Sequence, residues 1–556
     1  MEISLKFYKS YLLALIFVLL NITGCQQQNT IQIEALKEAY LAELHLTNSN
    51  LLITEVANNL EVPWEITWGP DNWIWFTEQK GTISKVNPET QEVKQLLSIP
   101  QVHYQKSRGL LGMAVHPDFT KQPYVYLHYT FLVKGEKLFN HETRSRLVSY
   151  KYDAQRDTLI NSTILLDNIP GKTFHNGSRV IISSDHKIFL STGDAGNTQG
   201  CQDINVLSGK LLRLNTDGSI PEDNPIKGSY VYSWGHRNAQ GLTFGRDNVL
   251  YSSEHGPNND DEVNLIRPSA NYGWPNVEGF CDKNNEQDFC KEFSIVEPIY
   301  AWTPTIAPSG ISYYDNNQIP EWKNSLIMGS LKGRSLRILK LNENGDKVID
   351  HEIYFQKVFG RIRDVCVSPK GDVYLATSNL DWHPKFQPQM YDQLPKDRDD
   401  KIIKLSKVAP SLIAELQIDK PQVLEKEVTE IESVAEVSMM SLANKDYEAG
   451  EALYLQHCSS CHQPNGEGLP DLIPPLAKTD WVTGNTSKLI AVVLAGTSEP
   501  MEVNGKIYEQ EMPGFSASLQ DEEIALILTY IRSHFGNEAN AVHKAFVTEE
   551  RRGLKL

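Results

Sequence analysis

One pattern recurs six times between residues 66 and 377 and limits what most of this chain can fold into. Each copy is an apolar strand, a turn built on Asp, Asn, Gly or Pro, and a second strand with an aromatic residue. Such turns between alternating strands are typical of β-hairpins. The copies start roughly 45 to 70 residues apart, a spacing that suits propeller blades with inserted loops better than a sandwich of irregular hairpins. We predict a six-bladed β-propeller with hairpins at residues 66–78, 113–129, 180–192, 242–253, 311–329 and 365–377.

A second domain is indicated by the run Cys458-Ser459-Ser460-Cys461-His462. Cys-x-x-Cys-His is the attachment signature of a covalent c-type haem, in which the two thiols bond the porphyrin and His462 binds the iron. A redox dithiol or half of a zinc site would need a βαβ context or a second ligand pair downstream, and neither follows. Helical patterns at residues 447–457 and 521–534 lie on either side of the downstream loop, so we expect a small all-α domain.

The second axial ligand of the iron is expected to be a methionine, because a Met/His-ligated haem has a raised potential that suits one-electron transfer. Two candidates follow the haem motif, Met501 and Met512. Met501 lies in the more polar stretch, whereas Met512-Pro513 resembles the distal-ligand loop of small class I cytochromes c. We therefore predict that Met512 binds the iron.

The length of 556 residues is too great for one ordinary core, so at least two domains are expected. The formal net charge of −17 argues against nucleic acid as a partner. Cys281 and Cys290 lie close together in a polar stretch and would form a disulfide if the compartment is oxidising. In the alternative, these two are reduced and buried together with Cys201 and Cys366.

The first residues have the features of an export signal. Lys6 and Lys9 precede an apolar run at residues 11–20, well short of the ~20 residues that a spanning helix needs. Ile22-Thr23-Gly24-Cys25 resembles a bacterial lipobox, which implies cleavage before Cys25 and a lipid on its thiol; a plain signal peptide cut elsewhere is the alternative. We expect a protein on the periplasmic side of the cell envelope, held to a membrane by a lipid anchor, which agrees with haem c attachment.

Changes in composition divide the chain into six parts. Strand patterns begin near Leu51 and stop near Leu405, acidic residues then outnumber Lys420 and Lys426, and helical patterns follow. The predicted parts are a lipoprotein signal peptide (1–24), a tether (25–50), the propeller (51–408), an acidic linker (409–443), a cytochrome c domain (444–536) and a tail (537–556).

Polar clusters occupy strand ends and loops of the predicted propeller, which is where propellers carry function. Several contain Arg or Lys from separate blades, and basic residues gathered at one face would bind a polyanion, an informative pattern in so acidic a chain. The clusters lie at residues 174–179, 193–199, 235–241, 254–262, 331–334 and 361–364.

From residue 63 to residue 405 the chain resembles the soluble PQQ-dependent glucose dehydrogenases and aldose sugar dehydrogenases. The likeness rests on these clusters and on the phrases at residues 211–221 and 271–276, in the family's order. It implies that His175 is the general base, with the carboxylate of Asp194 near it. It also implies a quinone-binding set, with Arg237 counted among the catalytic residues as well, and a calcium ion held by main-chain carbonyls. The PQQ set is Gln199, Arg237, Asn238, Lys332, Arg361 and Arg363, and the calcium donors are Gly256 and Pro257.

The chemistry of these residue types agrees with the implied roles. PQQ carries carboxylates and an electrophilic ortho-quinone, so guanidinium groups and a lysine supply charge-assisted hydrogen bonds. Calcium takes oxygen ligands, main-chain carbonyls included, and polarises a quinone carbonyl as a Lewis acid. A neutral histidine is suited to removing a sugar hydroxyl proton while hydride leaves the carbon.

Three positions depart from the family. Ser107-Arg108 stands where a Gln or Glu near the cofactor is common, Phe174 stands where a polar residue often precedes the base, and His255 stands where the glucose enzymes have Gln. These changes bear on the substrate pocket more than on the cofactor.

Together these features predict an exported quinohaemoprotein that oxidises an aldose at the anomeric carbon to a lactone. PQQ would take two electrons, haem c would remove them singly, and an external cytochrome or oxidase would accept them. Two alternatives stay open: the same enzyme acting on another polyol or a sorbosone-like aldehyde, and a propeller that only binds, joined to a redox-carrier haem domain.

Overall fold

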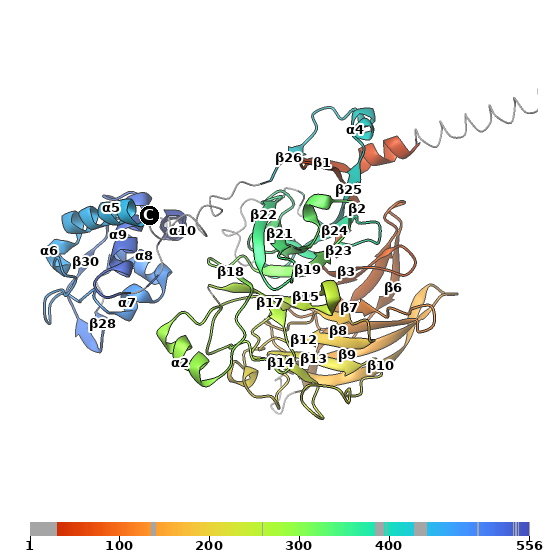
Figure 1. Cartoon of the computed structure of the whole chain (residues 1–556), viewed down its shortest axis with the longest axis horizontal. Helices are drawn as coiled ribbons and strands as arrows, with labels where there is room; N and C mark the ends of the chain where they lie inside the picture. The colour runs from red at the N-terminus through yellow and green to blue at the C-terminus, as the bar shows by residue number, and fades with distance from the viewer. Residues whose placement is uncertain are drawn as a thin grey trace, which may run out of the picture. The chain divides into compact units, whose positions relative to one another are not determined.

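The computed structural model describes residues 31–134, 141–257, 259–383, 394–395, 397, 399–426, 442–497, 500–537, 539, 542 and 544–554. The chain forms two compact units, residues 1–428 and 429–556, and each is described by itself (Figure 1). The predicted export signal with Cys25, and the acidic stretch at 427–441, lie outside the described residues.

The first unit contains six sheets, each of which begins with one of the predicted hairpins. Ile66 pairs with Phe76 in the first hairpin, for example, and Val365 with Leu375 in the last. The prediction of six blades is confirmed. Five blades have four strands each: β3 (Pro63–Trp68), β4 (Ile74–Glu78), β5 (Thr82–Val86) and β6 (Val93–Ser98); β7 (Leu110–Val115), β8 (Tyr124–Lys134), β9 (His141–Asp153) and β10 (Thr158–Pro170); β11 (Val180–Ile182), β12 (Lys187–Ser191), β13 (Lys210–Asn215) and β14 (Val231–Trp234); β15 (Ala239–Phe244), β16 (Leu250–Glu254), β17 (Asp261–Ile266) and β18 (Tyr300–Trp302); β19 (Pro308–Tyr314), β20 (Ser325–Ser330), β21 (Ser335–Leu341) and β22 (Val348–Tyr354).

The sixth blade joins the two ends of the unit. Its strand order is β23-β24-β25-β2-β1-β26, so a strand from the start of the chain completes a blade built from its end. The innermost strands β3, β7, β11, β15, β19 and β23 contact one another in turn, and β23 contacts β3, which closes the ring. The strands are β23 (Ile362–Val367), β24 (Val373–Thr377), β25 (Asp400–Val408), β2 (Asn50–Leu60), β1 (Tyr40–His45) and β26 (Val423–Leu424).

Two predicted connecting segments are partly folded. The tether predicted at 25–50 is wrong for residues 31–39, which are helical, and for β1, whose Leu44 is buried in the core. The linker predicted at 409–443 is wrong for its first part, because α4 (Pro410–Leu416) and β26 belong to the first unit. β1 and β26 pair with each other across more than 370 residues, as Glu43 and Val423 do, and no local pattern reveals such a partner.

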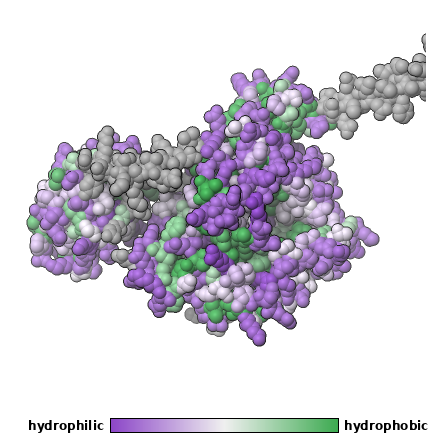
Figure 2. Space-filling view, viewed as in Figure 1, coloured by the Kyte–Doolittle hydropathy of each residue, from purple (hydrophilic) through white to green (hydrophobic). Residues whose placement is uncertain are grey.

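Turn residues explain why the hairpins form at these places. Asn72, Asn248 and Gly371 have φ values of 62°, 61° and 93°. These values lie in the left-handed region, which Gly and Asn adopt at least cost. Between the blades, apolar side chains such as Trp322 and Tyr354 pack into continuous clusters. On the face seen in Figure 2, hydrophilic residues make up most of the surface of this unit.

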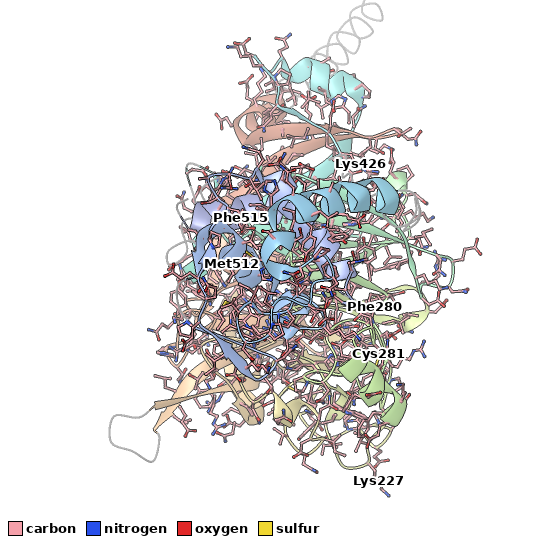
Figure 3. The ribbon with its side chains drawn as sticks, turned by 90° about the vertical axis from the view of Figure 1, so that its left-hand side faces the viewer. Lys227, Phe280, Cys281, Lys426, Met512 and Phe515 are labelled. Atoms are coloured by element: carbon pink, nitrogen blue, oxygen red, sulfur yellow. A yellow bond between two sulfur atoms is a disulfide. The ribbon has the colours of Figure 1, made fainter. Side chains whose placement is uncertain are left out.

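Among the described cysteines one disulfide is present, between Cys281 and Cys290, and it joins the helix α2 (Asn284–Glu292) to the segment before it. Figure 3 labels Cys281 and its neighbour Phe280 beside this helix. Cys201 and Cys366 are buried free thiols. Of the two alternatives for the four cysteines, the structure therefore has the one in which Cys281 and Cys290 form a disulfide. The described residues of this unit also include short 3-10 turns at Gln199–Cys201, Arg246–Asn248 and Pro320–Trp322.

The second unit is mainly helical, as predicted, with two short pairs of strands. The predicted helices at 447–457 and 521–534 correspond to α5 (Leu442–His457) and α9 (Asp521–Ser533). The tail predicted at 537–556 is wrong for α10 (Lys544–Gly553), which packs on α8 (Thr486–Ala495) and α9 with Val547 buried. The elements are α5 (Leu442–His457), α6 (Ser459–His462), α7 (Asp480–Thr483), α8 (Thr486–Ala495), α9 (Asp521–Ser533) and α10 (Lys544–Gly553), with β27 (Gly496–Thr497) paired to β30 (Met512–Pro513) and β28 (Met501–Val503) paired to β29 (Lys506–Tyr508).

None of the helices in the described parts of the chain is both long and apolar enough to cross a bilayer.

Candidate functional site

The predicted site residues gather at one end of the propeller because of how antiparallel strands alternate. In every blade the first strand begins, and the second strand ends, at the same end of the sheet. His175, Arg237 and Arg361 precede the first strands β11, β15 and β23, and Gly256 follows the second strand β16. All of them therefore belong to loops at one end.

His175 and Asp194 form a hydrogen-bonded pair. The Nδ1 atom of His175 lies 2.9 Å from Oδ1 of Asp194, which also accepts the Gly196 amide at 2.8 Å. Burial alone would raise the pKa of Asp194, but its bond and charge attraction to His175 and the Gly196 bond together lower it below its ordinary value. The ionised carboxylate assigns the ring proton to Nδ1, so Nε2 of His175 is left as a proton acceptor.

The backbone holds this pair tightly. His175 has a φ of 50°, an uncommon conformation for a residue other than glycine. Its carbonyl accepts the Ala195 amide at 3.1 Å, and a Cβ on Gly193 would lie only 2.0 Å from the same oxygen. The loop before β11 and the loop after β12 can approach this closely only because residue 193 is a glycine.

Arg237 and Asn238 lie beside the pair in the next blade. The main-chain carbonyl of Arg237 accepts the Asp194 amide at 2.8 Å, and its guanidinium Nη1 donates to the His255 carbonyl at 3.1 Å. Asn238 Oδ1 accepts the Gly177 amide at 3.1 Å. Burial lowers the pKa of Arg237, and burial together with nearby guanidinium charges lowers that of His255 well below its ordinary value. His255 is thus neutral and donates from Nε2 to the Pro308 carbonyl at 2.9 Å.

Arg361 and Arg363 share one buried carboxylate. Arg361 Nη2 donates to Oδ2 of Asp381 at 2.6 Å, and Arg363 Nη2 lies 3.6 Å from the same oxygen. Burial acts against ionisation of Asp381, yet the charge of Arg361 and the bond to His383 hold the pKa of this carboxyl well below its usual range. Burial lowers the pKa of Arg363 to about 10, so it stays charged at neutral pH.

Lys332 lies near the loop that carries Gly256. Asp261 accepts the Gly256 amide at 2.8 Å through Oδ1 and the Ile306 and Ala307 amides through Oδ2. Lys332 is exposed, donates to Thr305 Oγ1 at 2.9 Å, and attracts the Asp261 carboxylate, whose pKa burial raises to about 6. One carboxylate thus fixes the turn at Gly256 relative to the next blade.

Gln199 and the three positions that depart from the family lie around these groups. Gln199 is exposed at the start of a short turn whose other residues are buried. Phe174 is 38% exposed, and its ring centroid is 4.8 Å from that of His175 in an edge-to-face contact. Ser107 accepts the Trp382 indole at 3.0 Å, and Arg108 donates to Thr143. The role of Gln199 in binding PQQ stays a prediction.

The haem motif borders a large apolar cavity in the second unit. The cavity encloses about 1080 Å³, counting its open mouth, and Cys458, Cys461 and His462 line it. His462 Nδ1 lies 3.1 Å from the Pro474 carbonyl oxygen, which can only accept a hydrogen bond. The ring proton is therefore on Nδ1, which donates to that carbonyl and leaves Nε2 available to an iron. Met501 and Met512 both line the cavity, but Met512 also packs against the hydrophobic core. Figure 3 labels Met512 together with Phe515, from the segment after the β28–β29 hairpin.

Comparison with known families adds a second, independent observation. The model of the glucose/sorbosone dehydrogenases matches residues 60–382, more than half of the chain. The chain belongs to the glucose/sorbosone dehydrogenase family. The cytochrome c family model matches residues 447–535 of the second unit. The protein is therefore a sugar dehydrogenase of the PQQ type, an oxidoreductase, with a cytochrome c domain.

Individual relatives cover the two units separately. Quinoprotein glucose dehydrogenase B of Acinetobacter calcoaceticus is 34% identical over 399 residues, which is 57% of this chain and 83% of the relative. Cytochrome c-552 of Thermus thermophilus is 37% identical over 121 residues, 21% of this chain and 78% of the relative. The solved PQQ-bound aldose sugar dehydrogenase of Streptomyces coelicolor is 30% identical with a TM-score of 0.54, and covers 64% of this chain and 98% of its own.

The residues of this glucose/sorbosone dehydrogenase fit PQQ. Within the described residues, the Nε atoms of Arg237 and Arg363 are buried without a hydrogen-bond partner. A buried guanidinium N–H that lacks a partner is costly, and an anionic ligand with carboxylate oxygens would supply one. The donor set of the site therefore matches the acceptor-rich cofactor that the family uses.

The residues predicted to bind calcium can be compared with the structure in the same way. Gly256 and Pro257 line a small cavity together with the acidic side chains Asp260, Glu262 and Glu278. Oxygen atoms of this kind suit calcium. The described residues contain no group of three or more His, Cys, Asp or Glu side chains placed to hold a metal, so main-chain carbonyls would have to complete the ligand set.

Sequence reasoning missed several residues of the dehydrogenase site. Four of them each hold a predicted site residue in place through a hydrogen bond: Asp381, Asp261, Gln240 and Trp274. Gln240, Asp261 and Trp274 lie within the stretches at 235–241, 254–262 and 271–276 that were singled out above, but the local sequence does not indicate which distant residue each contacts. Asp381 lies outside every polar cluster used to find the site.

We predict that Asp381→Asn destabilises the propeller at neutral pH. The substitution removes the negative charge with which both Arg361 and Arg363 pair. Such a change typically costs ~3–5 kcal/mol in free energy of unfolding. Because the pKa of Asp381 is lowered on folding, its contribution is fully present above the unfolded pKa of ~3.9. The contribution is lost progressively as the pH falls from that value towards the folded pKa, so part of it is already lost at pH 3. The measurement is the free energy of unfolding of the propeller in urea, for the wild type and the variant, at pH 7, 5 and 3.

The matched control is Asp288→Asn, at an aspartate whose side chain is 78% exposed. It should change the free energy by less than ~0.5 kcal/mol at all three pH values. A deficit for Asp381→Asn that is as large at pH 3 as at pH 7 would contradict the assignment of an ionised Asp381.

Proposed function

We propose that the enzyme oxidises an aldose at its anomeric carbon to the lactone, with His175 as general base, and passes the electrons to its own haem c. The observation that carries this proposal is the bonded pair of His175 and Asp194 beside Arg237 and the Arg361–Arg363 pair. A proton acceptor and a cationic pocket for an anionic quinone stand next to each other. That is the arrangement that oxidation of a hydroxyl group requires.

His175 does the proton chemistry. With Nδ1 donating to Asp194, the Nε2 lone pair accepts the proton of the anomeric hydroxyl, and the developing imidazolium is stabilised by the carboxylate. The anomeric carbon loses a hydride, its oxygen becomes a carbonyl, and the sugar leaves as a lactone. PQQ, when bound, supplies an electrophilic quinone that takes up this pair of electrons, polarised by calcium.

The basic residues hold the cofactor. Arg237, Arg361 and Arg363 are buried or half-buried and charged, so they offer short charge-assisted hydrogen bonds to carboxylate oxygens. Lys332, Asn238 and Gln199 would complete the set, and Gly256 and Pro257 would give carbonyl oxygens to calcium. Arg237 also stands where it can balance negative charge that forms as the hydroxyl proton is removed.

An aldose is favoured as substrate over a sorbosone-like aldehyde. A cyclic sugar has an apolar C–H face and a hydroxyl rim, and the exposed ring of Phe174 against His175 offers a surface for that face.

The haem would carry electrons singly to an external acceptor such as a cytochrome or oxidase. His462 and Met512 would bind the iron, a ligand pair that raises its potential. The export motif supports a lipid anchor on Cys25 at the periplasmic side of the envelope.

His175→Ala tests the proposed base. Loss of a positioned base typically lowers the rate ~10²–10⁴-fold, so sugar oxidation should fall by that factor with either an artificial dye or the haem as acceptor. The measurement is steady-state and stopped-flow kinetics on enzyme reconstituted with PQQ and calcium, and the haem spectrum should not change. A variant with at least a tenth of the wild-type rate would refute His175 as the base.

Met512→Ala is the complementary variant in the same experiment. It should lower the haem potential and slow haem reduction, and leave sugar oxidation with the dye nearly intact. In the wild type, the rate constant of haem reduction after sugar addition should be independent of protein concentration, because the electron donor and the haem belong to one chain. A rate proportional to concentration would show that the haem is reduced between molecules.

Metal removal tests the calcium proposal. Extensive chelation should abolish sugar oxidation with the dye, and calcium added with PQQ should restore it. Haem content serves as the internal control, since the covalent haem is not affected by chelation. Full activity of the metal-free enzyme would contradict the proposal that calcium is required.

Cys25→Ser tests the lipid anchor. We expect the variant to move from the membrane fraction to the soluble fraction and to lose the mass of the lipid, measured by fractionation and mass spectrometry of the N-terminal peptide. If the variant remains in the membrane fraction with its mass altered only by the substitution, anchoring at Cys25 is wrong.

A further inference from the structure

Trp274 contacts both halves of the proposed site. Its indole Nε1 donates to Oδ2 of Asp194 at 3.2 Å, while Oδ1 of the same carboxylate is taken by His175 and Gly196. The Arg237 guanidinium carbon lies 5.2 Å from the centre of the Trp274 ring. One side chain therefore touches the partner of the base and a quinone-binding arginine at once.

The position of Trp274 is fixed by its own main chain. The Trp274 amide donates to the Gly235 carbonyl at 3.0 Å, and the Trp274 carbonyl accepts Gln202 Nε2 at 2.6 Å. Gln202 Oε1 in turn accepts the Asn271 side chain at 2.8 Å. The loop that carries Gln202 thus determines where the indole lies.

A buried lysine holds that loop. Lys210 is fully buried, and its Nζ donates to the main-chain carbonyls of Gly200, Cys201 and Ser208 at 2.8, 3.0 and 2.6 Å. Three acceptors match the three N–H groups of an ammonium. Burial lowers the pKa of Lys210 to about 8, so the ammonium form prevails at neutral pH. These three carbonyls form a cage that is the main support of the buried cation.

We propose that Trp274, held through Gln202 by the Lys210 cage, is a positioning residue that orients Asp194 and Arg237 together. The contacts form one path from Lys210 through the loop at 200–208 and Trp274 to Asp194 and His175. The indole N–H sets the plane of the carboxylate, and the carboxylate sets the ring of the base. The indole face holds the arginine toward the quinone pocket. This inference rests on the proposed function of His175.

Two substitutions separate the two contacts of Trp274. Trp274→Phe keeps an aromatic face for Arg237 and removes only the N–H, so kcat for glucose with the dye should fall about 10-fold, with KM and PQQ affinity unchanged. Trp274→Leu removes both contacts and should also weaken PQQ binding about 10-fold, measured by calorimetric titration of the full-length apoenzyme with PQQ in the presence of calcium. Lys210→Met should lower kcat and reduce the Tm.

The matched control is Trp322→Phe, the same exchange at a tryptophan buried in the hydrophobic core away from the site, which should keep wild-type kcat and PQQ affinity. Wild-type kcat in Trp274→Phe, or equal PQQ affinities in the Phe and Leu variants, would overturn the proposal. A parallel His175→Ala variant tells the two failures apart. If it is inactive while Trp274→Phe is normal, only the role of Trp274 is wrong; if it is fully active, the proposed function itself has failed.

Discussion

The propeller depends on a buried ion cluster that ties blades from different parts of the chain. Arg179, just before β11, lies 2.5 Å from Glu65 of β3 and 3.0 Å from Asp364 of β23, and all three side chains are buried. Burial raises the pKa of both carboxyl groups, and the charge of Arg179 opposes that rise. Breaking a buried pair by removing one partner costs ~3–5 kcal/mol, a large part of the total stability of a domain.

The same cluster supports the site. Arg179 Nε donates to the main-chain carbonyl of Gln240 at 2.9 Å. The Gln240 side chain donates to the Gly177 carbonyl at 3.0 Å and accepts Arg363 Nη1 at 3.1 Å. Gly177 is two residues from the proposed base, and Arg363 belongs to the proposed quinone-binding set. The network that closes the ring therefore also sets the distance between the base and the cofactor pocket.

The parts of this fold that could be predicted from sequence are those with a local signal. A hairpin can be predicted from its turn residues, and the haem site from five adjacent residues, because the residues that form each of these features are neighbours in the chain. β1, β26 and α10 carry no such signal, since their strand partners or packing surfaces are distant in sequence. Asp381 could not be predicted for the same reason, because the sequence around an aspartate in a loop does not indicate that two arginines are its partners.

The distribution of charge explains how the site can exist before any cofactor is bound. Asp381 already pairs with both Arg361 and Arg363, and the Asp194 carboxylate lies near Arg237, so burial of these cations is tolerated. The pairing is incomplete, because Arg237 and Arg363 keep buried Nε atoms without acceptors among the described residues. An anionic quinone would therefore gain new hydrogen bonds without breaking those that hold the arginines. Little of its binding energy would be lost to rearrangement of the protein, and the guanidinium groups would already have the positions that the reaction requires.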